Sequence, residues 1–281
     1  MSGTLYLCAT PIGNLEDITL RVLRILKEVD LIAAEDTRTS GHLLRHFDIH
    51  TPTTSYHKFN EHEKGRELVD KLLAGTNIAL ITDAGTPAIS DPGETLVRLC
   101  IENHIQVTSL PGANACITAL TLSGRSTRRF SFEGFLPADK KDRDEILRQI
   151  KTERRTIVLY EAPHRLVKTL KLLAETLGET RGITLCRELT KKFETITVTT
   201  IGEAIAQADN TEPRGEYVLV LDGKPDEEIE TERRAEFETM SIADHVASFE
   251  AQGMTRKEAM KAVAVARGMS RRDVYQELLS E

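Results

Sequence analysis

Apolar and polar residues alternate along the first 120 residues in a way that predicts strands separated by amphipathic helices. Short, β-rich apolar runs predict strands at residues 4–8, 30–34, 52–56, 78–82 and 105–109. Helical patterns lie between them, such as residues 18–29, where Leu20, Leu23, Ile25 and Leu26 lie on or near one face. This alternation predicts a parallel sheet with helices packed on it.

The pattern changes after a turn-rich segment at residues 123–126, where we place a domain boundary. Beyond it, the residues predict a helix at 165–177 and strands at 156–160, 183–186, 195–200 and 217–221. Because no helix separates the strands at 183–186 and 195–200, the second sheet should be antiparallel or mixed. We therefore expect an α/β fold with two such domains, residues 1–122 and residues 123–225.

Residues 226–281 are expected to form an acidic linker and a small helical module. The acidic run from Asp226 to Glu230 follows Gly223-Lys224-Pro225, which indicates a linker. Turns at Gly253 and Gly268 divide the rest into short helices. Thr255 and Ser270 each precede an acid by three residues, as residues at a helix start do.

Three of the predicted strands run into loops that contain both glycine and proline. These loops are residues 9–14, 82–87 and 111–114. Ligands of open α/β sheets bind at the carboxyl ends of parallel strands, where glycine permits close approach of the backbone and proline orders the loop beforehand. No Gly-x-Gly-x-x-Gly and no Gly-x-x-x-x-Gly-Lys-Ser/Thr occurs, so dinucleotide and P-loop phosphate sites are not expected.

Carboxylates stand at or near the predicted strand ends, namely Glu35, Asp36, Asp83, Asp91, Glu161 and Glu188. Such a rim would repel pyrophosphate but attract a cation, because opposite charges attract strongly where water is partly excluded. The alternative is that these acids cap helices. For Asp91 we expect capping, because Pro92 after it suits a first helical position.

The formal net charge of −7 argues against indiscriminate binding to nucleic acid. Local basic clusters, such as Arg271-Arg272, leave open whether a particular face contacts a polyanion or is only solvated. Neither a signal peptide nor a long apolar span is visible, so we expect a cytoplasmic protein that does not enter a membrane.

Cysteines and histidines give no sign of a metal centre. Cys8, Cys100, Cys116 and Cys186 lie far apart without a Cys-x-x-Cys pair, which predicts buried reduced thiols. His42 and His46 form an i, i+4 pair, a spacing that is more often incidental than a ligand pair. We therefore expect no bound metal.

Seven motifs carry a resemblance to a known family over about residues 3–223. In order, they are residues 9–15, Ala34-Glu35-Asp36-Thr37-Arg38, residues 82–87, Glu133-Gly134-Phe135-Leu136-Pro137, Tyr160-Glu161-Ala162-Pro163-His164-Arg165, Arg187-Glu188-Leu189-Thr190-Lys191 and Arg214-Gly215-Glu216. Together they resemble the ribosomal RNA small subunit methyltransferase I family, bacterial cytidine 2′-O-ribose methyltransferases of the tetrapyrrole methylase superfamily. Thr82 and Asn114 stand where that family often has serine.

The resemblance implies the two-domain, class III methyltransferase fold, with S-adenosyl-L-methionine in the cleft between the domains. It also implies a homodimer and a cytidine ribose of small-subunit (16S) ribosomal RNA as the substrate. The residues agree on one point independently. S-adenosyl-L-methionine is a sulfonium cation without phosphates, so loops rimmed by carboxylates suit it better than a phosphate cradle would.

By this resemblance, cofactor contacts fall on Thr10, Pro11, Ile12, Asp83, Ala84, Gly85, Thr86, Pro87, Ile89, Ser90, Asn114, Tyr160, Glu161, Leu189 and Glu216. Methyl transfer to a ribose hydroxyl needs alignment with the sulfonium methyl and a path for the proton. Candidate bases are Glu35, Asp36, His57, Glu161 and Glu188, with Arg38, Arg187 and Lys191 to position phosphate or hydroxyl. For His57, an exposed loop position is an equal alternative.

Two other functions remain open from the sequence. One is a methyltransferase of the same superfamily that acts on a tetrapyrrole or a protein side chain, and the other is a non-catalytic ribosome-assembly factor. The helical module at residues 226–281 would dock the enzyme onto RNA or ribosomal protein, or else serve as a packing appendage or dimer brace.

Overall fold

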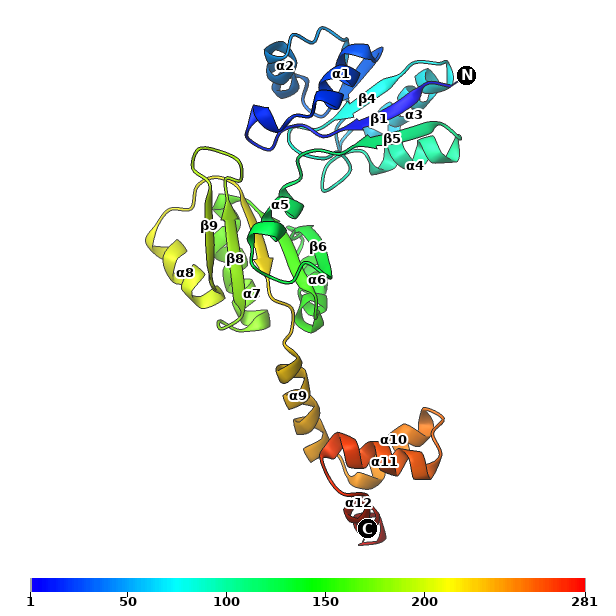
Figure 1. Ribbon diagram of the computed structural model, residues 1–281, viewed down its shortest axis with the longest axis vertical. Coiled ribbons are helices and arrows are strands. Elements are labelled where there is room, and N and C mark those ends of the chain that lie inside the picture. Colours follow the sequence, from blue (N-terminus) through cyan, green and yellow to red (C-terminus); the bar gives the residue numbers. More distant parts are fainter. Residues whose placement is uncertain (1, 281) are drawn as a thin grey trace. The chain divides into compact units, whose positions relative to one another are not determined.

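Ten strands in two five-stranded sheets organise the part of the chain that the structure describes (Figure 1). The computed structural model describes residues 2–280, apart from the side chains of residues 233, 234, 236–239 and 280. The chain divides into one unit of residues 1–222, which holds both sheets, and a second unit of residues 223–281.

The first sheet is parallel throughout, as expected, with the strand order β3-β2-β4-β1-β5. Its strands are β1 (Thr4–Cys8), β2 (Leu31–Ala34), β3 (Thr53–Ser55), β4 (Ile78–Ile81) and β5 (Gln106–Leu110). The predicted strand positions are confirmed to within two residues. Because all strands run the same way, the loops that follow β1, β4 and β5 emerge at one edge.

Helices cover both faces of this sheet and bury its alternating side chains. The connections contain η1 (Leu15–Asp17), α1 (Leu20–Glu28), α2 (Thr37–His46), α3 (Glu61–Leu73) and α4 (Glu94–Glu102). Leu5 and Leu80 belong to one apolar cluster with residues of α3 and α4, whereas Ala79 and Ile81 belong to another with residues of α1 and α2. Both faces are therefore apolar, as parallel sheets require.

The second sheet is mixed, as expected, with the order β6-β7-β10-β8-β9. Its strands are β6 (Phe130–Phe135), β7 (Thr156–Glu161), β8 (Gly182–Arg187), β9 (Thr195–Thr200) and β10 (Tyr217–Leu221). Only β6 and β7 pair in parallel. The helices α6 (Lys140–Thr152), η2 (Pro163–Arg165), α7 (Leu166–Leu177) and α8 (Ile201–Asn210) complete this half.

Strand β6 (Phe130–Phe135) is absent from the strands predicted from the sequence. The strand is interrupted by a register shift between Phe132 and Gly134, and Gly134 has φ +61°. A glycine bulge breaks the period-two pattern of a strand, which hides it from sequence patterns.

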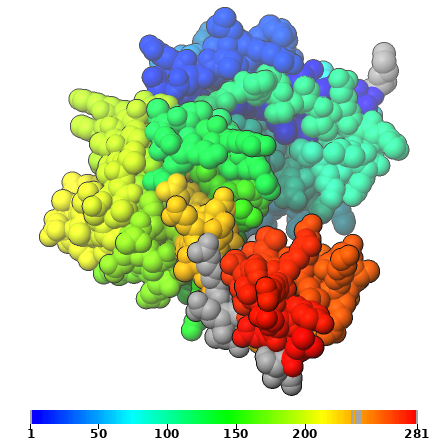
Figure 2. Space-filling view, turned by 60° about the horizontal axis from the view of Figure 1, so that its bottom comes forward, coloured from blue at the N-terminus to red at the C-terminus, as the bar shows by residue number. Residues whose placement is uncertain are grey.

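Helix α5 (Ala115–Leu122) packs on the second sheet, although the sequence placed it in the first domain. Its residues Cys116, Ala119 and Leu120 share an apolar cluster with Val158 of β7 and Val218 of β10. The change of sheet therefore precedes residue 115, and we propose a boundary in the loop at residues 111–114 in place of residue 122. The space-filling view shows the two halves of residues 1–222, blue to cyan and green to yellow, in direct contact (Figure 2).

The second unit contains four helices, α9 (Asp226–Thr239), α10 (Ile242–Ala251), α11 (Arg256–Arg267) and α12 (Arg271–Ser280), within the described residues. Three of them surround a small apolar cluster of Ile242, Val246, Ala259, Val263, Ala264 and Val274. The expected turns and helix starts are confirmed. Thr255 and Glu258 form a capping box, and Ser270 and Asp273 cap each other's backbone N–H groups at 3.2 Å.

The acidic run from Asp226 to Glu230, which the sequence indicated to be a linker, is helical. These residues form the first turns of α9, directly after Pro225 at the N-cap. Acidic side chains in a first helical turn interact favourably with the positive end of the helix dipole. Charge alone therefore could not separate a linker from a helix start.

Among the described residues, no helix is both long and apolar enough to cross a membrane.

Candidate functional site

The loops that follow β1, β4 and β5 are bonded to one another at the carboxyl edge of the first sheet. Thr10 and Gly85 exchange two backbone hydrogen bonds, of 2.9 and 3.0 Å. The Thr86 hydroxyl donates to the carbonyl of Ala113 at 3.0 Å. Gly85 has φ +83°, and a Cβ there would stand 3.3 Å from Cγ2 of Ile12. The three loops thus form one ordered edge in which Gly85 presents bare backbone.

A cavity of about 390 Å³ lies where these loops meet the second sheet. Ten of the predicted cofactor residues line it, namely Ile12, Ala84, Gly85, Thr86, Ile89, Asn114, Tyr160, Glu161, Leu189 and Glu216. The predicted catalytic residue Lys191 lines it as well. Further lining residues, which the sequence did not predict as cofactor contacts, include Asp91, Phe135, His164, Cys186, Tyr217 and Val218. The volume falls in the range of about 300–1,000 Å³ that is usual for small-molecule sites.

The remaining predicted cofactor residues lie elsewhere. Thr10, Pro11 and Asp83 line a second cavity, of about 330 Å³, beside helix α2. Pro87 lines a groove against α4. Ser90 lies against β6, because a Cβ on Gly134 would stand 2.7 Å from the Ser90 hydroxyl oxygen. The structure therefore spreads the predicted set over the larger cavity, the second cavity and two further positions, at Pro87 and Ser90.

Asn114 and Tyr160 together position the start of helix α5 beside the cavity. The Asn114 side chain accepts a hydrogen bond from the N–H of Ile117 at 3.1 Å and so caps the helix. The N–H of Cys116 donates to the Tyr160 hydroxyl at 3.1 Å. Burial raises the pKa of Tyr160 to about 12, so this phenol stays protonated and serves as a wall of the cavity.

The Glu161 carboxylate contacts three donors from neighbouring residues. Its side chain is completely buried, and it accepts hydrogen bonds from the Thr169 hydroxyl at 2.5 Å and the Ala162 N–H at 2.8 Å. Arg165 Nε stands 3.4 Å from the same carboxylate. A carboxylate held by three donors fixes the connection from β7 to α7, and we therefore remove Glu161 from the candidate bases.

Glu35, Asp83 and Asp91 bring three carboxylates together after β2 and β4. Burial and the neighbouring charges of Glu35 and Asp83 raise the pKa of Asp91 to about 7. Burial also raises the pKa of Glu35, whose Oε2 accepts the Asp83 N–H at 3.4 Å. A cationic ligand would relieve this repulsion.

Asp91 does not cap a helix, which corrects the expectation from sequence. Helix α4 begins at Glu94, and Gly93 occupies its N-cap with φ +145°. Before it, Ala88 and Ser90 take positive φ values of +67° and +63°. Because of these positive φ values, the helix begins only at Glu94, and the Asp91 side chain lies at the wall of the larger cavity.

Asp36, by contrast, is a helix cap. It accepts the N–H of Arg38 at 2.7 Å at the start of α2 and pairs with the Arg38 guanidinium at 3.0 Å. Hydrogen bonds from Arg38 lower the pKa of Asp36 to about 2. Such a carboxylate is a poor proton acceptor at neutral pH, and its role is to orient Arg38.

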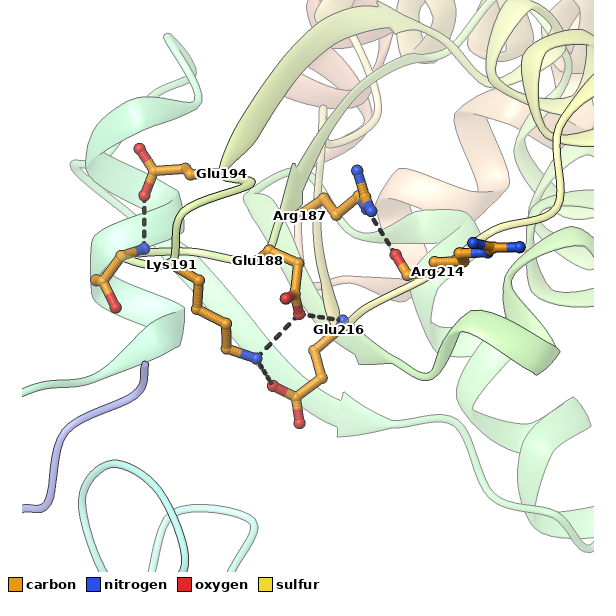
Figure 3. Close-up of polar contacts among 7 residues, drawn as sticks. Arg187, Glu188, Lys191, Glu194, Arg214 and Glu216 are labelled. Atoms are coloured by element: carbon orange, nitrogen blue, oxygen red, sulfur yellow. Dashed lines mark hydrogen bonds and ion pairs between the residues drawn. The ribbon is translucent and has the colours of Figure 1, made fainter. Parts of the chain in front are cut away.

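Glu188, Lys191 and Glu216 form a network at the other side of the cavity (Figure 3). Lys191 Nζ stands 2.9 Å from Glu188 Oε1 and 2.8 Å from Glu216 Oε2. The Glu216 N–H donates to Glu188 Oε1 at 3.0 Å, and this bond and Lys191 lower the pKa of Glu188. Burial works to lower the pKa of Lys191, but its two carboxylate partners outweigh it and raise the pKa.

Arg187 and His57 were the remaining candidates. Arg187 Nε donates to the carbonyl of Arg214 at 2.6 Å, as Figure 3 also shows, which joins β8 to the segment before β10. His57 lies near Glu35, and its buried Nδ1 has no hydrogen-bond partner among the described residues. The structure gives Arg187 a bracing role and leaves His57 next to the carboxylates.

Within the described part of the chain, no group of three or more His, Cys, Asp or Glu side chains could hold a metal ion. His42 Nδ1 lies 3.0 Å from the guanidinium of Arg45. All four cysteines are free and buried, as expected, and burial raises the pKa of Cys8 to about 12.

Comparison with known proteins identifies the family of the chain. The sequence profile of the Tetrapyrrole (Corrin/Porphyrin) Methylases matches residues 4–205. A ribosomal RNA small subunit methyltransferase I from Synechocystis sp. is 48% identical over 274 residues, 98% of this chain and 96% of that protein. Another, from Haemophilus influenzae, is 54% identical over 228 residues, 80% of each chain. The chain belongs to this family of methyltransferases.

Solved structures of the tetrapyrrole methylases share the fold. The uroporphyrin-III C-methyltransferase of Thermus thermophilus, in complex with S-adenosyl homocysteine, has a TM-score of 0.56 at 20% identity. The match covers 78% of this chain and 97% of that one. The predicted α/β, tetrapyrrole-methylase-like fold is therefore confirmed.

Proposed function

We propose that this methyltransferase transfers a methyl group from S-adenosyl-L-methionine to the 2′-hydroxyl of a cytidine ribose in small-subunit (16S) ribosomal RNA. The observation that carries the proposal is the cavity between the two sheets, with bare backbone at Gly85, an apolar wall at Ile12 and Leu189, and carboxylates at Asp91 and Glu216. These features suit a sulfonium cofactor that carries an ammonium group and no phosphate. The names of the relatives supply the substrate class.

The candidate catalytic residues divide into a proton-accepting group and a positioning group. When bound, S-adenosyl-L-methionine supplies an electrophilic methyl group. Asp91 accepts the ribose proton, because its pKa is raised to about 7 and a base works best when its pKa lies near the operating pH; Glu35, whose pKa is also raised, is the second candidate.

Two cations orient the RNA in this proposal, each held by a carboxylate. Asp36 fixes Arg38 and Glu188 fixes Lys191, so these four predicted catalytic residues act as two ion pairs. The Arg38 side chain is 90% exposed, which leaves its guanidinium accessible to a phosphate. Holding the hydroxyl in line with the methyl can itself supply much of the rate enhancement.

The test is incubation with tritiated S-adenosyl-L-methionine and small subunits that lack the modification, with naked 16S RNA as a second substrate. We expect label in RNA, at a single cytidine whose 3′ linkage resists alkali, because 2′-O-methylation blocks hydrolysis. Label on a base atom or a protein would reject the chemistry, as would label in a tetrapyrrole precursor offered in parallel. No transfer to any substrate, with intact particle binding, would favour an assembly factor.

We also propose that the enzyme is a cytoplasmic homodimer. The superfamily resemblance supports the dimer, as does an apolar groove on the first sheet's side, where Ile89 and Ile101 are 40% and 63% exposed. Light scattering at micromolar concentration should give twice the chain mass of 31.4 kDa. A mass of one chain would end the proposal.

A further inference from the structure

The second cavity, between the loop after β1 and helix α2, contains buried polar atoms without partners. Ser40 and Thr82 line it and are only 3% and 1% exposed. Neither hydroxyl has a hydrogen-bond partner among the described residues. Leaving such a group unsatisfied costs about 1–3 kcal/mol, so each calls for an explanation.

The hydroxyl of Thr10, in the same cavity, does have a hydrogen-bond partner within the protein. Thr10, which lines the same cavity, is 2% exposed, and its hydroxyl donates to the carbonyl of Thr82 at 3.0 Å. Ser40 and Thr82 differ from Thr10 because their buried hydroxyls make no hydrogen bond within the described residues, although both residues line the cavity. A hydroxyl can both donate and accept, so the pair is adapted to a polar ligand.

Other groups around the cavity suit a planar, amino-bearing ligand. Asp83 is exposed and adds a carboxylate, an acceptor of amino hydrogens. His42 and His46 lie one helical turn apart on α2, and Pro11 lies on the loop opposite. Imidazole rings and apolar side chains are the surfaces on which unstacked bases pack.

We infer that this cavity receives the base of the target cytidine, flipped out of the RNA. The Ser40 and Thr82 hydroxyls donate to the acceptors O2 and N3 of cytosine, and the Asp83 carboxylate accepts from its N4 amino group. Uracil presents a carbonyl oxygen in place of that amino group, and the carboxylate repels it. The site therefore selects cytosine over uracil by charge as well as by shape. The inference rests on the proposed function.

The position of the cavity relative to the cofactor site supports this assignment. Pro11 and Gly13 line the base cavity, whereas Ile12, between them, lines the larger one. Alternate residues of one loop thus face two cavities. A nucleotide whose base enters one would place its ribose at the loop that borders the other.

The experiment compares two substrates, unmodified small subunits with cytidine or with uridine at the target position. Thr82→Val and Ser40→Ala should each lower kcat/KM on the cytidine particle by roughly tenfold, while calorimetric affinity for S-adenosyl-L-methionine stays near wild type. Asp83→Asn should narrow the preference for cytidine over uridine at least tenfold, because an amide can donate to the uracil oxygen.

The matched control is Ser131→Ala. Its hydroxyl on β6 is also buried without a partner among the described residues, but it does not line this cavity, so its kinetics should match wild type. Circular dichroism checks the fold of each variant.

If Ser40→Ala and Thr82→Val leave the kinetics unchanged, the two hydroxyls do not bind the base, and the inference is overturned. An unchanged cytidine-to-uridine ratio in Asp83→Asn would do so independently, at an exposed residue whose replacement does not endanger folding. Failure of the wild-type enzyme to methylate the cytidine ribose would instead reject the proposed function.

Discussion

Gly13 lies directly against the side chain of Lys191, so that a Cβ at residue 13 would stand 2.3 Å from Lys191 Cγ. The loop after β1 and the turn after β8 therefore meet, although they belong to different sheets. Lys191 is held from the other side by Glu188 and Glu216. Because residue 13 has no side chain, there is room for Lys191 at the wall of the cavity.

Gly13→Ala should push the Lys191 side chain into the cofactor cavity that it lines, and this obstruction should weaken binding of S-adenosyl-L-methionine roughly tenfold, a loss of about 1.4 kcal/mol. Gly124→Ala is the matched control, because Gly124 also has a positive φ, +69°, but a Cβ there meets nothing within 4 Å. Calorimetry on both variants measures the effect. Equal affinity in the two would show that the contact has no part in cofactor binding.

Gly85→Val should abolish cofactor binding. The backbone there has φ +83°, and the new side chain would enter the space between Ile12 and the cavity. Gly178→Val imposes nearly the same backbone strain, at φ +87°, in open space at the end of α7. Calorimetry should find binding only in the Gly178 variant. Wild-type affinity in the Gly85 variant would place the cofactor elsewhere.

The rate of methyl transfer should depend on the ionisation of Asp91. Because the base must be deprotonated, kcat should fall as the pH drops below the Asp91 pKa of about 7. Asp91→Asn should abolish this fall of kcat at low pH and should lower the kcat that is reached at high pH. If kcat of the variant still falls at low pH as in wild type, another group accepts the proton, with Glu35 as the next candidate.

Asp91 should also make the folded protein less stable as the pH rises. Its pKa in the folded state is raised from the ordinary 3.8, so stability is lost between about pH 4 and pH 7, where the unfolded chain is ionised and the folded one keeps the proton. Above pH 7, Asp91→Asn should therefore raise the melting temperature relative to wild type, and the difference should shrink below pH 4. Thermal denaturation across this range measures it.

Glu161→Gln should destabilise the fold by about 1–3 kcal/mol, because an amide nitrogen would face one of the three donors around this buried carboxylate. Glu67→Gln is the control, since Glu67 is exposed and its ion pair with Lys64 lies at the surface. Urea denaturation of both variants gives the comparison. An equal, small effect would mean that Glu161 is free to act in chemistry.

Deleting residues 226–281 should leave cofactor affinity near wild type and raise KM on the ribosomal particle. The deletion lies within the second unit, which has its own apolar cluster, whereas the cofactor cavity lies wholly within residues 1–222. The double substitution Arg271→Ala and Arg272→Ala in the full chain tests the same role by charge alone. Unchanged kinetics on particles in both would favour a packing appendage or dimer brace.

The sequence by itself determined the features that depend on local chemistry. Strand positions such as residues 78–81 follow from apolar runs, and the helix starts at Thr255 and Ser270 follow from side chains that cap neighbouring backbone groups. The prediction that a ligand approaches the backbone closely at Gly85 rests on the same kind of local signal, a glycine in a loop at the end of a strand. These signals lie within a few residues of the feature that they specify.

Only the tertiary structure decided what each carboxylate does and which cavity each loop residue faces. Asp36 and Asp91 both follow first-sheet strands, yet one is held ionised by Arg38 and the other has a raised pKa because burial places it near Glu35 and Asp83. Likewise, α5 packs on the second sheet, and adjacent residues of the loop at 10–13 face different cavities. Desolvation and charge depend on residues far apart in the chain, so no local pattern encodes them.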